Sequence, residues 1–493
     1  MRANPHVFEI NTKPWLSKLR EKYGAKLTLG TVPDEEWQEL KHLGFDAVWL
    51  MGVWKTSPKA REIARTTPAL QKEMAAIKPD YKVEDIDASP YAIFDYSLDP
   101  ELGAEEELKQ LREKLNGMGI CLLLDFVSNH LAIDHPLVNS CHDCFVQAEH
   151  DDVQYHPDWF FEAPQASAYL AYGRDPNFPP WRDTVQLNYF NFKTRQFMLD
   201  TLRKIAQLCD GVRCDMVMLS LNDVHDGTWG WLLRKKGYMR PDKEFWPEAI
   251  QTIKEEFPHF LFLAEVYWGL EWRLQEMGFD YTYDKVLYDR LRYLGPLDVK
   301  SHLRAEKLYQ KRSLRFIENH DEQPALTAFG KEKSLAAAIA LSTLRGMRLF
   351  YYAQINGLSV KIPIQYANCD FPEDAQVRKL YTKIIKIADH PAFHGGEWML
   401  IEPRSVGPGN DSFKNILCWS WTQRRTCKVI IVNYSAAQAQ ARVPVTISPK
   451  DDSYNFFDEL SDIFLVRPAE EVKAQGLFVD LPPYGAHMLD LEF

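Results

Sequence analysis

One pattern recurs along most of this chain: an amphipathic helix, a glycine or proline, and then a short apolar strand. The segment 104–115 carries leucines at helical spacing, and Gly117 separates it from the apolar run 120–125. The same order leads into further predicted strands at 47–50, 211–215, 260–265 and 349–352. Apolar strands that alternate with helices are typical of parallel strands buried on both faces.

Two folds satisfy this pattern, an open doubly wound sheet and a closed (β/α)8 barrel. No G-x-G-x-x-G sequence follows the first strand, as a dinucleotide-binding open sheet would require. Seven or eight repeats fit closure better than an open sheet. We therefore predict an α/β fold built on a (β/α)8 TIM barrel.

The repeating pattern is interrupted once and then ends. The segment 128–191, rich in His, Pro and aromatic residues, is too long for one connecting helix, and we predict that it forms a lid subdomain inserted after the third strand. After about Trp398 the pattern changes to alternating strands, which predicts a C-terminal antiparallel β-sandwich domain. The predicted domains are a barrel from 1–127 and 192–397, a lid at 128–191 and a β-domain at 398–493.

Charge and composition limit the classes of partner. The 493 residues are 46% hydrophobic and carry a net charge of −11, without a block of Lys and Arg that would suit a nucleic acid or a membrane surface. The N-terminus lacks an apolar leader region, and nowhere do 18 apolar residues run together. We therefore expect a soluble, cytoplasmic protein that binds neither nucleic acid nor membrane.

The eight cysteines are scattered, several of them inside apolar runs, and we expect them to be reduced. Cys141 and Cys144 form the one C-x-x-C sequence. With no second pair at zinc-ligand spacing, this sequence fits a loop with ordinary thiols, and a redox or metal role stays open as the alternative.

Acidic residues stand at the ends of several predicted strands. Arg213 and Asp215 are two residues apart, so they share one face of a strand, while Cys214 between them faces the outer helices. Taken alone, the Arg213 and Asp215 pair also fits a structural ion pair. Asp125, Glu265 and Asp321 follow other strands, and the carboxyl ends of barrel strands meet at one mouth, where catalytic groups gather.

Four blocks containing these acids resemble, in order, the four conserved regions of the α-amylase family of glycoside hydrolases (glycoside hydrolase family 13). The blocks are Asp125-Phe-Val-Ser-Asn-His130, Gly211-Val-Arg-Cys-Asp215, Ala264-Glu-Val-Tyr-Trp268 and Phe316-Ile-Glu-Asn-His-Asp321. The stretches 89–96 and 186–188 agree with two further family segments. The resemblance covers about residues 5 to 360.

The resemblance implies a retaining mechanism with three catalytic acids. Asp215 would attack the anomeric carbon and form a covalent glycosyl-enzyme. Glu265 would protonate the leaving oxygen and then deprotonate the acceptor. Asp321 would bind the sugar hydroxyls more tightly as the ring flattens toward an oxocarbenium ion. No cofactor is required for this chemistry.

Five further residues gain roles from the same resemblance. Arg213 would hold the nucleophile ionised and oriented, with Asp125 as its second partner. His130 and His320 would donate hydrogen bonds to sugar hydroxyls, and Tyr91 would stack under the same ring. Without the resemblance, His130 fits a hydrogen-bonded loop histidine and Tyr91 fits ordinary packing.

Asn129 matches a position that binds a structural calcium in many relatives. Since no cluster of acidic ligands is evident in the predicted lid, a hydrogen-bonded loop asparagine is the favoured interpretation, and a structural calcium stays possible.

Three functions remain open. The first is a hydrolase acting on α-glucans or malto-oligosaccharides, and the second is a transglycosylase or glucanotransferase, or a relative that uses sucrose, trehalose or maltose phosphate, with the same acids. Tyr267 and Trp268, just past Glu265, would favour a sugar acceptor over water, although packing explains them equally well. The third is a retired relative without catalysis, which predicts the loss of at least one acid, whereas all three are present.

Overall fold

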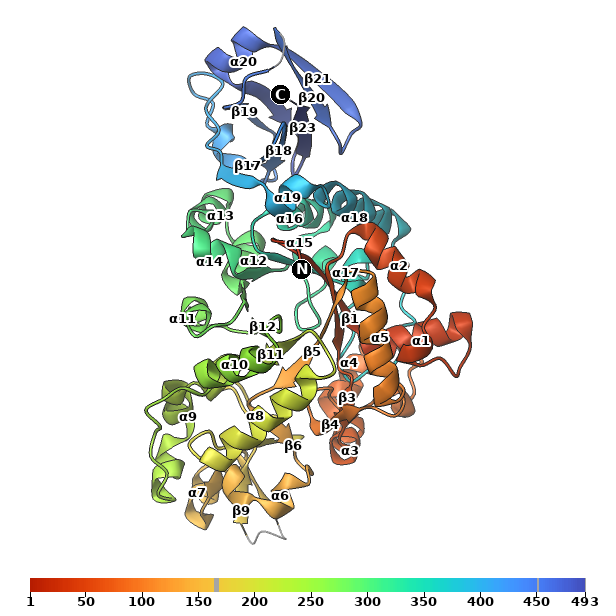
Figure 1. The fold of residues 1–493 in the computed structure, drawn as a ribbon, viewed down its shortest axis with the longest axis vertical. Helices are drawn as coiled ribbons and strands as arrows, with labels where there is room; N and C mark the ends of the chain where they lie inside the picture. Colours follow the sequence, from red (N-terminus) through yellow and green to blue (C-terminus); the bar gives the residue numbers. More distant parts are fainter. Residues whose placement is uncertain (164–167, 450–451, 493) are drawn as a thin grey trace.

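The computed structural model describes residues 1–163, 168–449 and 452–492. Eight parallel strands close into a barrel, as predicted (Figure 1). Around the barrel the strands are β1 (His6–Asn11), β15 (Met347–Tyr351), β14 (Ser313–Arg315), β13 (Tyr281–Tyr283), β12 (Leu261–Ala264), β11 (Gly211–Asp215), β5 (Cys121–Val127) and β2 (Ala47–Met51).

Helices surround the barrel, most of them with one buried and one exposed face. Those that the sequence pattern predicted are α2 (Asp34–Leu43), α5 (Glu105–Gly117), α8 (Phe192–Ala206), α10 (Phe245–Glu256) and α16 (Lys331–Thr343). The other helices that follow the barrel strands or their loops are α1 (Thr12–Tyr23), α3 (Pro58–Thr66), α4 (Pro68–Ile77), α9 (Asn222–Lys235), α11 (Glu271–Glu276), α12 (Lys285–Tyr293), α13 (Pro296–Leu303), α14 (Lys307–Lys311), α15 (Ala325–Phe329), α17 (Tyr352–Ile355), α18 (Ala375–Ala388) and α19 (Pro391–Gly395).

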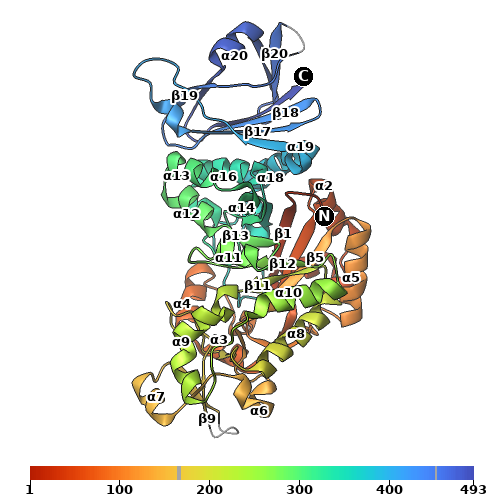
Figure 2. The ribbon, with the colours of Figure 1, turned by 60° about the vertical axis from the view of Figure 1, so that its left-hand side comes forward.

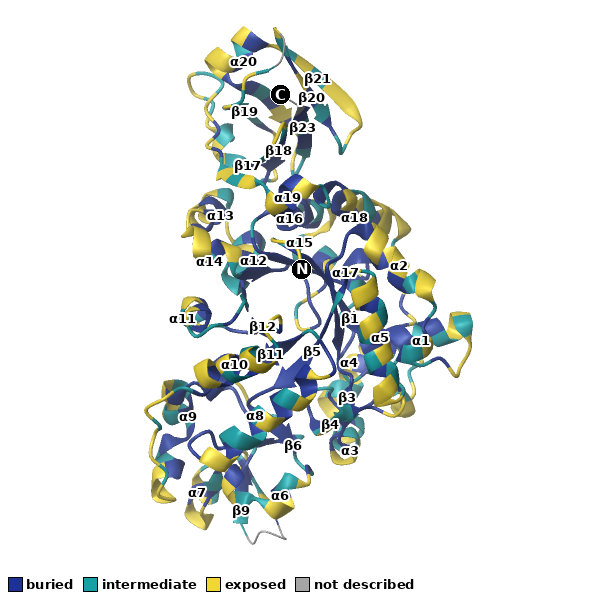
Figure 3. Ribbon diagram, in the orientation of Figure 1, coloured by how far each residue is buried: buried dark blue, intermediate teal, exposed yellow. Residues whose placement is uncertain are grey.

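Each barrel strand separates two layers of core. Cys214 lies with Met198 of α8 in the outer cluster between strands and helices, as predicted from its position in β11. Leu123 of β5 and Leu263 of β12 belong to the inner cluster that fills the barrel. In Figure 3 the barrel strands are accordingly drawn as buried, while the outer helices expose one face. Alternation along each strand therefore sends some side chains inward and others toward the helices.

Strands β1 and β13 extend the set that the apolar pattern identified. β1 is buried throughout although it contains His6, Glu9 and Asn11, and β13 has only three residues. Glu9 is paired in register with Trp49 of β2 on one side and Tyr351 of β15 on the other. A buried carboxylate in mid-strand requires a partner, and that partner is described with the site.

The insertion follows the third barrel strand, β5, as predicted. Its strands are β6 (His130–Ala132) paired with β10 (Thr184–Gln186), and β7 (Gln147–Ala148), β9 (Ala168–Ala171) and β8 (Phe160–Ala163) in a second sheet. Its helices are α6 (Leu137–Ser140) and α7 (His150–Tyr155). An antiparallel pair, β3 (Trp54–Thr56) and β4 (Ile93–Leu98), lies before the insertion in sequence.

The expectation that all cysteines are reduced is wrong for one pair. Cys141 and Cys144 form a disulfide, with their Cα atoms 5.4 Å apart, and the other six cysteines are free. The short turn between α6 and Phe145 brings the two thiols together, and the sequence spacing alone did not indicate that approach.

The last part of the chain forms the predicted antiparallel β-structure. Six strands make one sheet in the order β16 (Glu397–Leu400), β17 (Ile416–Gln423), β18 (Thr426–Asn433), β23 (Ala486–Glu492), β20 (Ser453–Asp458) and β21 (Ile463–Pro468). β19 (Ala439–Val443) pairs with β22 (Leu477–Leu481), and α20 (Ala469–Gln475) precedes β22. Figures 1 and 2 place this sheet and the insertion at opposite ends of the molecule, with the barrel between them. Among the described residues, no helix has the length and apolar character needed to cross a membrane.

Candidate active site

Arg213 is the centre of the site. It points from β11 into the barrel mouth with 1% of its side chain exposed, and its Nη1 donates to Asp215 Oδ1 at 2.7 Å. Its Nη2 donates to Glu265 Oε2, also at 2.7 Å, and lies 3.9 Å from Asp321 Oδ2. The three acids that the sequence placed at separate strand ends therefore meet around one guanidinium.

Local backbone geometry supports this meeting. β11 and β12 are neighbours in the barrel, so Asp215 and Glu265 emerge from adjacent strand ends. Met216, directly after Asp215, has a φ of 43° and donates its backbone N–H to Glu265 Oε2 at 2.8 Å. The turn after β11 thus fixes the second acid as well as the first.

Asp125, the predicted second partner of Arg213, forms an ion pair with it, with 3.7 Å between Asp125 Oδ1 and Arg213 Nη1. Glu265 is a further partner that the prediction did not include, and it is hydrogen-bonded to Arg213 at 2.7 Å. Asp125 stands beside Arg213 in register on β5, but its Oδ2 accepts the backbone N–H of Gly52 at 3.0 Å. Burial raises the pKa of Asp125 to about 6.

Asp215 and Asp321, the two aspartates that flank Arg213, differ in the pKa of their carboxyl groups. Burial, together with the charges of Glu265 and Asp321, raises the pKa of Asp215 to about 7, although Arg213 acts in the opposite direction. Desolvation acts against ionisation of Asp321, whose side chain is 43% exposed, yet the charge and hydrogen bond of His320 bring its pKa well below the ordinary value. Asp321 is therefore ionised at neutral pH, and Asp215 titrates close to pH 7.

Tyr91 and His130 line the cavity, and His320 lies behind its wall. The Tyr91 hydroxyl is 2.7 Å from His320 Nε2, and Asp321 Oδ2 is 3.0 Å from the same nitrogen. His320 thus contacts the cavity through Tyr91 and Asp321. Burial lowers the pKa of His130 to about 3, so its ring is neutral and can donate from only one nitrogen.

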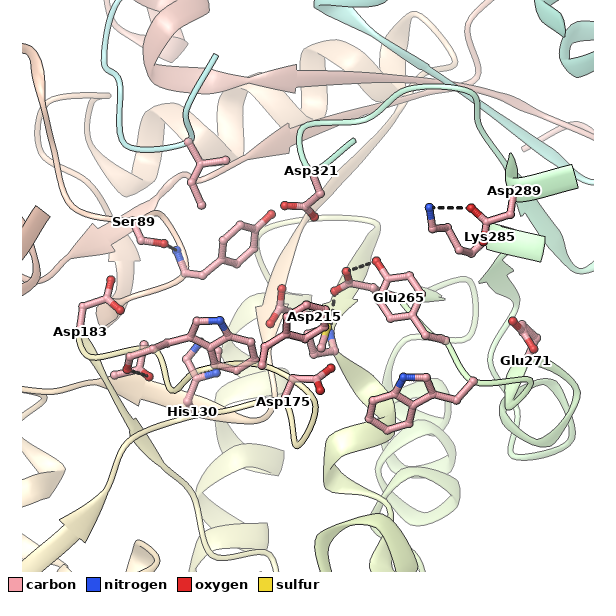
Figure 4. Close-up of a pocket in the computed structure, with 18 of the residues that line it drawn as sticks. Ser89, His130, Asp175, Asp183, Asp215, Glu265, Glu271, Lys285, Asp289 and Asp321 are labelled. Carbon is pink, nitrogen blue, oxygen red and sulfur yellow. Dashed lines mark hydrogen bonds and ion pairs between the residues drawn. The ribbon is translucent and has the colours of Figure 1, made fainter. Parts of the chain in front are cut away.

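These side chains surround a cavity of about 870 Å³ at the mouth of the barrel. Figure 4 places Asp215 and Glu265 near its centre, with His130 and Asp183 on the left, Asp175 below Asp215, and Glu271, Lys285 and Asp289 on the right. The insertion therefore supplies one wall, and the loops and helices after β12 and β13 supply another.

The two aromatic residues after Glu265 have different surroundings. The Tyr267 hydroxyl donates to Glu265 Oε1 at 2.8 Å. Trp268 lines the cavity with 44% of its surface exposed and has a φ of 66°, a conformation that non-glycine residues rarely adopt. Tyr267 is accordingly a hydrogen-bond partner of the proposed acid, and Trp268 presents a ring to the cavity.

The surroundings of Asn129 do not fit a calcium site. Its side-chain oxygen accepts from Gln186 Nε2 at 2.9 Å, and its backbone carbonyl accepts from the same nitrogen. In the described ranges, no three His, Cys, Asp or Glu side chains gather as a metal site would need. Asn129 joins β6 to β10 through this amide pair.

Sequence reasoning did not identify several residues of the cavity wall. They are Asp175, Phe178, Trp181 and Asp183 of the insertion, and Glu271, Lys285 and Asp289 after β12 and β13. The acidic and aromatic content of the insertion was the available signal for the first group. In the second group, Glu271 begins the short helix α11 after β12, and Lys285 and Asp289 follow β13, a strand of only three residues that the apolar pattern did not reveal.

The comparisons with known proteins agree with this architecture. The model of the alpha amylase catalytic domain matches residues 35–365. The "Alpha-amylase MalA" of Haloarcula japonica is 24% identical over 417 residues, which cover 82% of this chain and 52% of that protein. An "Alpha-1,4-glucan:maltose-1-phosphate maltosyltransferase" of Picrophilus torridus is 24% identical over 204 residues, or 40% of this chain and 26% of that one. The chain thus spans about half the length of the first of these relatives.

Among solved structures, the fold resembles a "noncanonic maltogenic alpha-amylase AmyB" from Thermotoga neapolitana. The TM-score is 0.67 at 19% identity, and the likeness covers 99% of both chains. This likeness concerns the fold, whereas the family model matches two thirds of the sequence and includes all three acids. The chain therefore belongs to the α-amylase family of glycoside hydrolases.

Proposed function

We propose that this protein is a retaining glycoside hydrolase that acts on α-glucans or malto-oligosaccharides. The observation that carries the proposal is the sharing of Arg213 by Asp215 and Glu265 at 2.7 Å each. Two carboxylates on one guanidinium lie close together, as the pair in a retaining enzyme must, at about 5 to 5.5 Å. In an inverting enzyme a water has to fit between them.

In the proposed mechanism, Asp215 attacks the anomeric carbon while Glu265 gives a proton to the leaving oxygen. A water then attacks the anomeric carbon of the glycosyl-enzyme and gives a proton to Glu265. This attack breaks the bond between the sugar and Asp215, and Asp215 is released as a carboxylate. Tyr267 steadies Glu265 by donating to its second oxygen. Asp321, held as a carboxylate, favours the positive charge that develops on the sugar ring.

The charge of the cavity wall supports a neutral donor. Among the described lining residues, seven are carboxylic acids, and Lys285 is the one Lys or Arg. Lys285 is already paired, with Glu322 at 2.7 Å and Asp289 at 3.1 Å. A phosphorylated sugar would meet repulsion here without a free cation to bind it. We therefore favour an uncharged glucan over maltose phosphate or another phosphorylated donor.

Transglycosylation is the second candidate function. It has the same glycosyl-enzyme, but a sugar hydroxyl replaces water in the second step. Trp268 favours it, because an exposed indole face three residues past Glu265 can stack on an acceptor sugar. The two candidates differ only in how well an acceptor competes with water.

Product analysis separates the two. The purified protein is incubated with maltoheptaose, with and without a tenfold excess of glucose, and the products are separated by length. Shorter chains that glucose does not change support the hydrolase, and chains longer than seven units support the transferase. In either case the first product is the α-anomer by proton NMR. A β-anomer would overturn the retaining mechanism, and no turnover would direct the search to sucrose, trehalose and maltose 1-phosphate.

A further inference from the structure

Glu9 is a buried acid that the mechanism above does not use. It lies in the middle of β1 with none of its surface exposed. Its Oε1 is 2.5 Å from His320 Nδ1 and also accepts the backbone N–H of His320 at 3.3 Å. A carboxylate is costly to bury without compensation, and within the part of the chain that the structure describes the side chain of Glu9 is hydrogen-bonded only to His320.

The far side of the His320 ring meets two further oxygens. Nε2 lies 2.7 Å from the Tyr91 hydroxyl and 3.0 Å from Asp321 Oδ2. The ring also stacks on Tyr91, with 25° between the planes. A carboxylate oxygen within 3.0 Å of each ring nitrogen favours a hydrogen on each nitrogen, because that hydrogen removes the repulsion between two facing acceptors. The geometry therefore describes an imidazolium held between Glu9 and Asp321.

We propose that Glu9 is a positioning residue that keeps His320 charged, so that His320 in turn holds Asp321 as a carboxylate and fixes Tyr91 in the cavity wall. Glu9 itself does not reach the cavity and acts through the histidine. The inference rests on the proposed function in one respect, because it assumes that Asp321 works as a sugar-binding carboxylate.

The electrostatics of the neighbouring elements agree with this arrangement. Burial opposes the charge of His320, but Asp321 and Glu9 together raise its pKa to about 10. Further charged groups near this chain of contacts are Asp125 on β5, Arg213 on β11 and Lys361, whose Nζ donates to the backbone carbonyl of Asp321. Glu318 lies near Glu9, but burial raises the pKa of Glu318 to about 8. Glu318 is therefore mostly a neutral acid at pH 7, and the negative charge near His320 Nδ1 comes from Glu9.

The protonation state of His320 can be measured without substrate. In protein labelled with ¹³C at histidine Cε1, His320→Gln identifies the signal of His320. The wild-type signal is expected to stay in its charged position from about pH 5.5 to 8.5, and Glu9→Gln is expected to bring its titration into that range. Glu318→Gln is the matched control, a buried acid at the same end of the barrel that does not contact His320.

Two results would overturn the inference: a wild-type His320 that titrates below pH 7, or a Glu9→Gln protein in which its titration is unchanged. If Glu9→Gln does not fold, the wild-type titration alone decides, and Glu9→Asp, which keeps the charge, is expected to keep the high pKa of His320.

Kinetics give a second readout. In Glu9→Gln, kcat/KM on maltoheptaose is expected to fall about tenfold more at pH 8.5 than at pH 5.5, since a basic limb displaced by one unit costs tenfold beyond it. Glu9→Asp should restore much of the loss at pH 8.5. A uniform loss at all pH values would assign Glu9 a merely structural role. Because the NMR titration needs no turnover, failure of the proposed function and failure of this inference are distinguishable.

Discussion

Arg213 holds the site together through the shape of its side chain. Its planar fork donates separately to Asp215 and Glu265, while Asp321 lies at 3.9 Å and adds to the charge that the guanidinium must balance. A lysine has no such fork and could not hold two carboxylates in a fixed relative orientation. The proposed nucleophile and the proposed acid are therefore positioned by one residue.

Asp215→Asn is expected to reduce turnover of maltoheptaose to below about 1% of the wild-type value, because a carboxamide cannot form the glycosyl-enzyme. The substitution is nearly isosteric, so the melting temperature should change little. Asp152→Asn is the matched control, since Asp152 is also buried and paired with a cation, Lys235, but lies outside the cavity wall. Turnover above about 1% in Asp215→Asn would exclude Asp215 as the nucleophile.

The pH dependence of kcat/KM should follow the ionisation of Asp215. Its pKa is raised to about 7, and it must be ionised to attack, so lowering the pH through this value protonates it and removes the nucleophile. We expect kcat/KM to fall about tenfold for each unit below about pH 6. Measuring kcat/KM on maltoheptaose from pH 4 to 9 tests this expectation. An acidic limb centred below pH 5 would mean that Asp215 keeps the pKa of an ordinary aspartate.

At the scale of elements, two neighbouring residues of the loop after β12, Tyr267 and Trp268, make different contacts. Tyr267 turns back to donate to Glu265, and Trp268 turns out into the cavity. Trp268 and Gly269 have φ values of 66° and 73°, so two successive residues of this loop adopt a left-handed backbone. Such a backbone costs on the order of 1–3 kcal/mol at a non-glycine residue, which is consistent with a role for the exposed ring.

Trp268→Ala is expected to lower the yield of chains longer than seven units, relative to hydrolysis products, about fivefold in the presence of excess glucose. The reason is the loss of a flat face for the acceptor, worth about 0.5–1.5 kcal/mol. Trp268→Phe keeps a flat ring and is the matched control. If Trp268→Ala and wild type give the same ratio of longer to shorter products, the ring does not contact the acceptor.

The elements that the sequence predicted are those with a clean apolar pattern. The sequence predicted β5, β11 and β12 because the residues on both faces of these strands are mostly apolar. The acidic residues at the ends of these strands then indicated where the site lies. β1 was not found because His6 and Glu9 interrupt its pattern, and both are accommodated by distant partners, Arg348 and His320. Long-range pairing of this kind leaves no local signal in the sequence.

The same limit applies within the site. The three acids could be predicted from strand ends and family blocks, but not which of them Arg213 holds. Asp125, the partner that the resemblance implied, is ion-paired with Arg213 at 3.7 Å and accepts the backbone N–H of Gly52, whereas Asp215 and Glu265 accept the hydrogen bonds of the guanidinium. The approach of Cys141 to Cys144 is likewise a matter of local geometry. Residue types and order were predictable, and the pairings between side chains required the structure.

At the scale of the whole molecule, the C-terminal sheet contributes residues to the outer hydrophobic cluster of the barrel and also has a hydrophobic cluster of its own. Trp419 and Trp421 of β17 belong to the same cluster as the alanine-rich face of α16. Trp421 Nε1 donates to the carbonyl of Thr343 at 2.6 Å, and the Tyr434 hydroxyl donates to the carbonyl of Leu291 at 2.8 Å. Since apolar burial and hydrogen bonds cross the boundary, we expect the two parts to unfold together.

Trp421→Ala tests this coupling. Trp421 is buried, so removing its ring is expected to cost about 3–5 kcal/mol of unfolding free energy and to lower the melting temperature of a single transition. At 25 °C, kcat/KM should stay within about twofold of wild type, because the ring lies outside the cavity wall. Phe464→Ala on β21, at a position 69% exposed, is the control and should leave the transition in place. Calorimetry that resolves two transitions, of which Trp421→Ala moves only one, would mean that the barrel stands without its C-terminal sheet.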